Sequence, residues 1–276
     1  MQTHLYADLN VGRGSIAYWS LHPRSTAIIF VHGFGGKATG TWLEFPGMLQ
    51  LEPLARNVDL IFFGYDGLRT RATNTAVMLE QFLNRLFTNA NSVVNGTLPH
   101  EWHRKAGFTY ERIVLVAHSL GAVVTRQALL DAHLRNRPWG QKTRMVLFAP
   151  AHCGSNLLRL VSSAAAGISI ELPGFSVNGE TAASALKIKL RVLQDLDEDC
   201  QTLRKLLDDT VAAIAPGGAN YLVPRRVFHA EFDDVVNPVR FAQDPPHDLL
   251  LGKDHMEICK PNGAFQDPIT AVLGEV

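Results

Sequence analysis

Residues 117–121 read AHSLG and place a histidine and a serine side by side within the most apolar stretch of the chain. An apolar run precedes them, a stretch with helical spacing follows, and small residues flank Ser119 at intervals of two. A strand-turn-helix of this kind exposes a serine hydroxyl at the carboxyl edge of a parallel sheet, on a strained turn. The pattern therefore predicts a nucleophilic serine in a G-x-S-x-G turn, with Ala117 in place of the first glycine. The alternative is structural: His118 bonds a backbone carbonyl and Ser119 caps the next helix.

A serine nucleophile needs a base, an acid to orient that base, and hydrogen-bond donors for the oxyanion. Residues 32–36, HGFGG, directly follow an apolar run, and glycines let backbone N–H groups approach a substrate oxygen. We expect the N–H of Phe34 to be one oxyanion donor and the N–H of Leu120, at the start of the helix after the serine, to be the other. A plain glycine turn is the alternative, and His32 is expected to stabilise the loop rather than act as the base.

Candidates for the acid and the base lie downstream. Asp233 and Asp234 follow the apolar run 225–232, and Asp233 is the predicted acid because it begins a D-x-V-V segment with a proline close behind. Asp234 stays open as the alternative acid. His255 is the predicted base because it lies in a polar loop before a C-terminal helical stretch, whereas His247 follows two prolines and is typical of loop packing.

Composition narrows the class of protein. The 276 residues contain 26 Lys plus Arg and 26 Asp plus Glu, so no net positive field attracts nucleic acid. The three cysteines form no C-x-x-C pair, and the N-terminus lacks a secretory pattern, so we expect a cytoplasmic protein. The apolar stretch 157–175 carries Arg159 and Glu171 and fails as a transmembrane segment, although peripheral contact with lipid stays open.

Short apolar runs without alternation predict strands buried on both faces of a parallel sheet. They occupy residues 26–33, 58–66, 112–119, 143–150 and 225–232. Helical spacing over residues 75–87 and 120–134 places helices between them, which favours an α/β domain. Residues 4–9 and 15–21 are expected to add antiparallel edge strands.

The alternation of strands and helices breaks over residues 155–220, which we interpret as a helical cap inserted into a single domain spanning residues 1–276. The candidate substrate-binding residues there are apolar: Leu157, Leu158, Leu160 and Val161. An apolar cap favours acyl or lipid-like substrates, but helices packed on the core would show the same pattern.

Other chemistries find little support in the sequence. HEWH at 100–103 lacks the histidine spacing of a zinc helix. HGFGG is not followed by Lys-Ser or Lys-Thr and is not G-x-G-x-x-G, which argues against phosphate-loop and dinucleotide sites. No metal or organic cofactor is predicted.

Taken together, these motifs make the chain resemble the α/β-hydrolase superfamily from residue 26 onward, and within it the serine esterase and lipase branch that includes GPI inositol-deacylase-like proteins. The residues that carry the resemblance are VHGFGGKATGTW at 31–42, FFGYD at 62–66, VAHSLGAVVTRQAL at 116–129, APAHCGS at 149–155 and DHMEICKP at 254–261. The Thr-Trp after the oxyanion loop matches Thr41 and Trp42, and Pro-x-x-Gly-Ser matches residues 150–155 only in part, through Pro150, Gly154 and Ser155. Ala117 and the triplet 151–153 depart from the branch.

The resemblance implies an α/β-hydrolase fold, with a mostly parallel central sheet flanked by helices. It also implies a Ser119–His255–Asp233 triad that cleaves carboxylic esters through an acyl-enzyme, as a carboxylesterase or lipase. The second hypothesis is a non-catalytic binding module on the same fold, since a fold does not fix a function.

Overall fold

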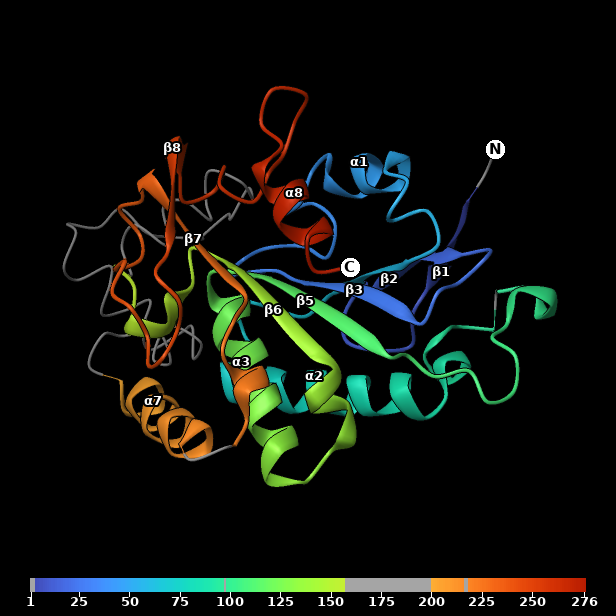
Figure 1. Ribbon diagram of the computed structural model, residues 1–276, viewed down its shortest axis with the longest axis horizontal. Coiled ribbons are helices and arrows are strands. Elements are labelled where there is room, and N and C mark those ends of the chain that lie inside the picture. The colour runs from blue at the N-terminus through green and yellow to red at the C-terminus, as the bar shows by residue number, and fades with distance from the viewer. Residues whose placement is uncertain (1–2, 97, 157–199, 216–217) are drawn as a thin grey trace, which may run out of the picture.

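The apolar runs of the sequence form a single sheet in the computed structural model, which describes residues 3–96, 98–156, 200–215 and 218–276 (Figure 1). Across the described chain the strand order is β1-β2-β4-β3-β5-β6-β7-β8. The strands are β1 (His4–Asp8), β2 (Ile16–Ser20), β3 (Thr26–Val31), β4 (Asp59–Phe63), β5 (Arg112–His118), β6 (Thr143–Phe148), β7 (Arg226–Phe232) and β8 (Asp248–Asp254). The helices are α1 (Phe45–Leu51), α2 (Ala72–Thr88), α3 (Leu120–Leu134), α7 (Gln201–Ile214) and α8 (Asp267–Leu273).

The sheet is parallel from β4 through β8, and β1 and β2 add an antiparallel edge. The register of the sheet brings the carboxyl ends of the central strands next to one another. Val31 of β3 pairs with Ala117 of β5, and His118 of β5 pairs with Phe148 of β6. The segments that leave β3 and β5 therefore begin side by side. Parallel strands thus bring HGFGG and AHSLG to one edge of the sheet, although about 80 residues separate them in sequence.

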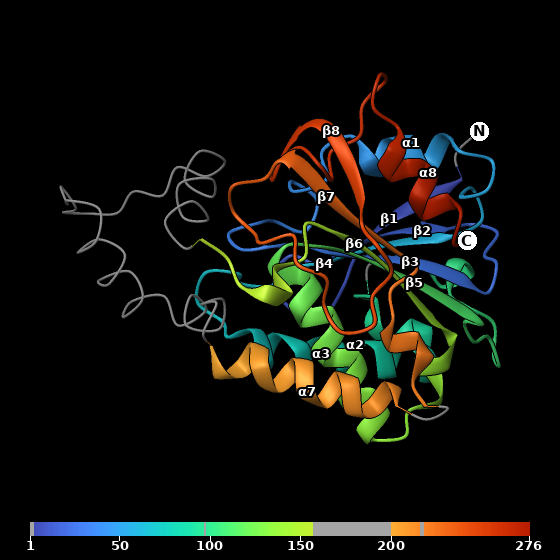
Figure 2. The same cartoon turned by 60° about the vertical axis from the view of Figure 1, so that its left-hand side comes forward.

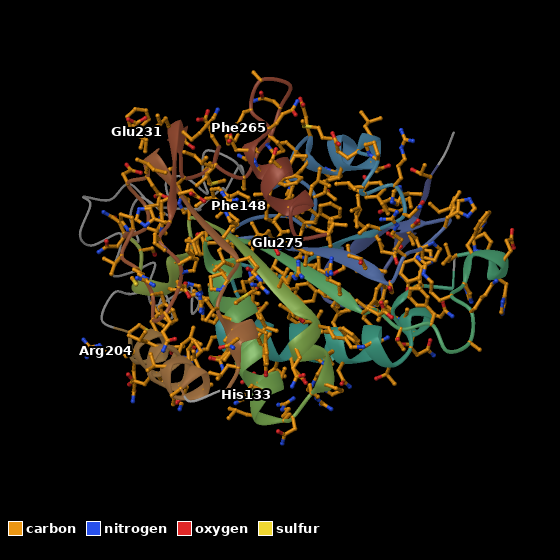
Figure 3. The ribbon with its side chains drawn as sticks, in the orientation of Figure 1. His133, Phe148, Arg204, Glu231, Phe265 and Glu275 are labelled. Atoms are coloured by element: carbon orange, nitrogen blue, oxygen red, sulfur yellow. The ribbon has the colours of Figure 1, made fainter. Side chains whose placement is uncertain are left out.

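Helices cover both faces of the sheet. α2, α3 and α7 lie on one face and α1 and α8 on the other, as Figures 1 and 2 both show. The stripe on α2 that the spacing predicts is buried: Leu79, Phe82, Leu83 and Leu86. Side chains fill the layers between the sheet and these helices (Figure 3).

α7 is the described helix of the predicted cap segment 155–220, and it packs against α3 in the layer that flanks the sheet (Figure 2). It buries Leu203, Leu206, Thr210 and Ile214, which recur at helical spacing along one face. The candidate substrate-binding residues Leu157, Leu158, Leu160 and Val161 lie outside the described residues.

Among the described strands and α-helices, most lie where the sequence predicts them and two are additional. The structure confirms the five buried strands and the two antiparallel edge strands, and α3 has the predicted bounds. α1 was not predicted, and neither was β8. β8 lies at an edge of the sheet and buries only Leu250, while Leu249 and Leu251 are exposed, so the strand carries neither an alternating nor a fully buried pattern.

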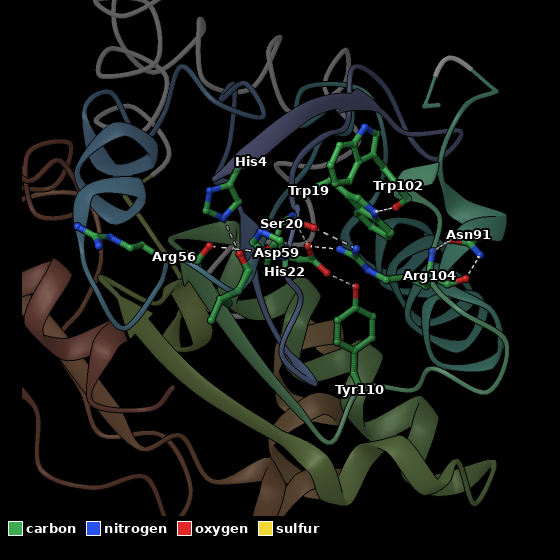
Figure 4. Close-up of polar contacts among 11 residues, drawn as sticks. His4, Trp19, Ser20, His22, Arg56, Asp59, Asn91, Trp102, Arg104 and Tyr110 are labelled. Carbon is green, nitrogen blue, oxygen red and sulfur yellow. Dashed lines mark hydrogen bonds and ion pairs between the residues drawn. The ribbon is translucent and has the colours of Figure 1, made fainter. Parts of the chain in front are cut away.

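A buried ion pair holds the end of the sheet opposite the serine turn. Asp59, the first residue of β4, accepts hydrogen bonds from Arg104 at 2.5 Å, the Tyr110 hydroxyl at 2.6 Å and the Ser20 N–H at 2.7 Å (Figure 4). The Arg104 guanidinium also stacks on Trp19, 4.0 Å from the ring centroid. Because both charged side chains are almost fully buried, their mutual attraction offsets the cost of removing each charge from water.

We predict that Asp59→Ala lowers the free energy of unfolding by about 3–5 kcal/mol, because it leaves the buried Arg104 guanidinium without its counterion. The matched control is Asp248→Ala, which removes a half-exposed pair with Arg226 and is expected to cost less than about 1 kcal/mol. Urea unfolding of both variants measures the difference. Equal losses in the two variants would contradict a stabilising role for the buried cluster.

Candidate active site

Ser119 occupies the sharp turn between β5 and α3. Its backbone has φ 54° and ψ −122°, a left-handed conformation that a non-glycine residue adopts only under constraint from its surroundings. The Ser119 N–H donates to the carbonyl of Phe148 at 3.0 Å, which ties the turn to the end of β6. The structure therefore has the strained turn that the AHSLG pattern predicts.

Gly121 lets α3 begin directly against β3. A Cβ at this position would lie 2.2 Å from the carbonyl oxygen of Val31 and 2.5 Å from that of His32. No side chain fits at that distance, so any larger residue would push the start of α3 away from the sheet. Ala117, by contrast, is a fully buried strand residue that pairs with Val31 and accommodates its methyl group.

His255 lies between Ser119 and Asp233, 136 and 22 residues away in sequence. Its Nε2 is 3.1 Å from the Ser119 hydroxyl oxygen, and its Nδ1 is 2.9 Å from Oδ2 of Asp233. A carboxylate only accepts hydrogen bonds, so Nδ1–H donates to Asp233 and Nε2 is left to accept from the serine hydroxyl. These three side chains are at most 3% exposed.

Asp233 is fixed in position by hydrogen bonds and is kept in its charged form. Its Oδ1 accepts the N–H groups of Val235 at 3.0 Å and Val236 at 3.1 Å. Burial by itself raises the pKa of Asp233, but the hydrogen bond and charge of His255, together with these two N–H groups, hold the pKa below its ordinary value. The structure pairs His255 with Asp233 and not with the neighbouring Asp234, the alternative that the sequence leaves open.

The loop after β3 packs against the serine turn. A Cβ at Gly33 would lie 2.9 Å from the Cβ of Ser119, so glycine is what permits this contact. Within the described residues, neither the N–H of Phe34 nor that of Leu120 donates a hydrogen bond to the protein. Both candidate oxyanion donors thus lack an acceptor in the part of the chain that the structure describes.

His32 stabilises this loop, as expected from the sequence. Its Nε2 accepts from the Tyr65 N–H at 3.3 Å, so its Nδ1–H donates to the carbonyl of Gly33 at 2.9 Å. The Tyr65 hydroxyl donates to the His32 carbonyl at 2.6 Å, and the two rings stack with centroids 4.2 Å apart. Burial lowers the pKa of His32 to about 4, so the ring stays neutral.

The other histidines near Ser119 have different partners. The His118 ring nitrogen Nε2 lies 2.8 Å from the carbonyl oxygen of His255. The His247 ring packs edge-on against His229, with centroids 4.8 Å apart. Burial, and then the nearby His247, lower the pKa of His229 to about 4. Neither His118 nor His247 occupies the position of a base toward Ser119.

The sequence did not single out Tyr65, Val235 or Val236 as contributors to the site. FFGYD was recognisable only as a match to the family, and backbone donors such as those of Val235 and Val236 carry no signal in residue type. Among the described residues, no group of three His, Cys, Asp or Glu side chains is arranged to hold a metal ion. No helix within the described ranges is both long and apolar enough to span a membrane.

Comparison with known proteins places this geometry in a known fold. No protein-family model matches the sequence, and no curated protein matches it. Among solved structures, the mature lipase BlEst2 of Bacillus licheniformis matches with a TM-score of 0.57 and 17% identity, over 95% of this chain and 98% of that one. The peroxisomal α/β-hydrolase Lpx1 of Saccharomyces cerevisiae matches with a TM-score of 0.52 and 11% identity, over 97% and 84% of the two chains.

The chain has an α/β-hydrolase fold. A further match is the phospholipase PlaB of Legionella pneumophila in complex with thio-NAD, with a TM-score of 0.54 and 16% identity. That match covers 83% of this chain but only 52% of PlaB. Ser119 follows the central strand β5, at the carboxyl edge of the sheet where hydrolases of this fold carry their nucleophile.

Because His32 is buried and neutral, we predict that the folded protein loses stability in acid. Its folded pKa of about 4 lies below the ordinary value of 6.5, so its contribution is complete above the unfolded pKa and is lost as the pH falls from 6.5 toward 4. Between about pH 7 and about pH 5 this group alone removes on the order of 2 kcal/mol from the free energy of unfolding.

Urea unfolding of wild type and His32→Gln at both pH values isolates this contribution, because glutamine can accept the Tyr65 N–H but does not titrate. We expect the wild type to lose more stability than the variant between the two pH values. The same loss in both proteins would show that His32 is not the neutral, buried group described here.

Proposed function

We propose that this protein is a serine hydrolase that cleaves carboxylic esters through an acyl-enzyme. The observation that carries the proposal is the continuous line of hydrogen bonds from the Ser119 hydroxyl through His255 to Asp233, anchored at a serine with φ 54°. A serine capped or packed for structural reasons needs neither the strained turn nor a histidine that is itself oriented by a carboxylate.

The residues take roles that follow from these contacts. Nε2 of His255 removes the proton from Ser119 as its oxygen attacks the ester carbonyl, and Asp233 stabilises the imidazolium that forms. His255 then gives that proton to the leaving alcohol, which departs and leaves Ser119 acylated. Water, deprotonated by the same nitrogen, releases the acid and restores the serine.

The N–H groups of Phe34 and Leu120 are the proposed oxyanion donors. Both lack an acceptor in the described protein and belong to the two segments that meet at Ser119. Loss of one such donor costs on the order of a hundredfold to a thousandfold in kcat in serine hydrolases. The loop geometry that His32 and Tyr65 maintain is therefore as important to the proposed reaction as the triad.

The class of ester is supported by the similar structures, which include a lipase and a phospholipase and so favour esters with acyl chains. An open hollow of about 460 Å³ lies beside the oxyanion loop, with Gly35 and Gly36 in its lining together with the charged residues Arg13, Lys37 and Asp66. We propose acyl esters, lipids included, as the substrate class. We also propose a cytoplasmic location, in keeping with the three free cysteines.

The first test is hydrolysis of p-nitrophenyl esters from acetate to palmitate. We expect turnover by wild type, and losses in kcat on the order of 10⁶-fold in Ser119→Ala and in His255→Ala, because either change removes the reacting pair. Covalent labelling of Ser119 by a fluorophosphonate probe checks the nucleophile without assuming a substrate. Folded wild type that neither turns over any ester nor accepts the probe would contradict the proposal and favour a binding module.

A paired test assigns the acid. Asp233→Asn should lower kcat on the order of 10⁴-fold, because the amide no longer holds the histidine in the required tautomer. Asp234→Asn is the matched control and should leave kcat unchanged. The reverse result would move the triad acid to Asp234.

Assays above and below the micellar concentration of one ester separate the two enzyme classes. A rate that rises as the substrate aggregates identifies a lipase, and a rate that does not rise identifies an esterase for dispersed substrates.

A further inference from the structure

His118 precedes the nucleophile in sequence, yet its ring faces the backbone of His255. The distance from its Nε2 to the carbonyl oxygen of His255 is 2.8 Å. A carbonyl only accepts, so Nε2 carries the proton and donates it. The side chain is 2% exposed, and the two imidazole rings lie with centroids 4.8 Å apart.

The opposite edge of the His118 ring contacts the oxyanion loop. A Cβ at Gly33 would lie 3.1 Å from Nδ1 of His118, and this nitrogen has no hydrogen-bond partner among the described residues. Burial, and then the charge of a protonated His255, lower the pKa of His118 to about 3, so the ring stays neutral. A neutral ring keeps a single proton, and that proton is already committed to the His255 carbonyl.

Within the described part of the chain, the other hydrogen bonds of His255 involve its ring. These are the hydrogen bonds to Ser119 and Asp233, and the proposed reaction changes the first of them in every cycle. The bond from His118 holds the backbone of the base and does not change with its protonation. It also fixes the distance between base and nucleophile, because His118 and Ser119 are adjacent in the chain.

We propose that His118 is a positioning residue: its Nε2–H holds the His255 backbone at the distance at which His255 can take the proton of Ser119. The inference rests on the proposed function and adds to it a residue that touches neither the substrate nor the transferred proton. Displacement of a reacting group by about 1 Å can cost on the order of a hundredfold in rate.

The test compares two replacements of similar length. His118→Gln places an amide N–H close to the position of Nε2, whereas His118→Met fills the space without a donor. The matched control is His4→Met, because His4 is also a buried histidine whose Nε2 lies 2.9 Å from a backbone carbonyl, that of Val58 in a different part of the sheet. Each variant is assayed on p-nitrophenyl esters, with active sites counted by fluorophosphonate titration and stability measured by thermal unfolding.

We expect His118→Met to lose about tenfold to a hundredfold in kcat with little change in KM, and His118→Gln to recover most of that loss. His4→Met should unfold at a lower temperature and keep its kcat. Wild-type kcat in His118→Met, or equal losses in the Met and Gln variants, would overturn the proposal while leaving the serine hydrolase intact.

A readout that needs no substrate separates this proposal from the proposed function. The proton shared between Nδ1 of His255 and Asp233 gives a strongly downfield signal in proton NMR when the histidine is held in place. We expect the signal in wild type, His118→Gln and His4→Met, and its loss in His118→Met. Persistence of this signal in His118→Met overturns the positioning role even if no ester is ever hydrolysed. If His118→Met does not fold, His118→Asn replaces it, because the asparagine amide is too short to reach the carbonyl.

Discussion

The strained turn at Ser119 is the constraint on which the rest of the site depends. A left-handed serine costs on the order of 1–3 kcal/mol and persists only where its surroundings fix it. Here the Phe148 carbonyl holds its N–H, and Gly121 lets α3 press against the carbonyl of Val31. Three neighbouring parallel strands therefore support the turn, and the hydroxyl cannot relax away from the edge of the sheet without disturbing all of them.

Helix α3 contacts the chain near two members of the proposed triad, Ser119 and Asp233. Its first turn supplies the Leu120 N–H, and Arg126 one turn further reaches the segment between Asp233 and β8. The Arg126 guanidinium pairs with Asp244 at 2.6 Å and donates to the carbonyl of Leu222 at 2.8 Å, with both charged side chains almost fully buried. The helix that follows Ser119 thus also fixes the chain that follows Asp233, and relative movement of the two carries the penalty of an unpaired buried charge.

Near Ser119, burial keeps several histidines neutral, whereas Asp233 stays charged. His32, His118 and His229 all have lowered pKa values, and burial is the first cause in each. The pKa of Asp233 is also lowered, but against the effect of burial: burial raises it, and the hydrogen bond and charge of His255 together with two backbone N–H groups outweigh that effect. With these histidines neutral, Asp233 is placed to stabilise the imidazolium that His255 becomes during the proposed reaction.

The sequence by itself determined the elements with strong local patterns. Unbroken apolar runs identified the five central strands, helical spacing gave the bounds of α3, and the flanking small residues marked the turn at Ser119. It did not reveal β8, because an edge strand with one buried residue has no periodic signal. Tertiary structure alone decided which aspartate meets His255, since Asp233 and Asp234 are chemically identical neighbours and only the path of the chain after β7 directs one of them inward. It also decided what His118 does: the sequence places it beside the serine, but its partner is a carbonyl 137 residues away, and a contact between distant segments exists only after the sheet has brought their ends together.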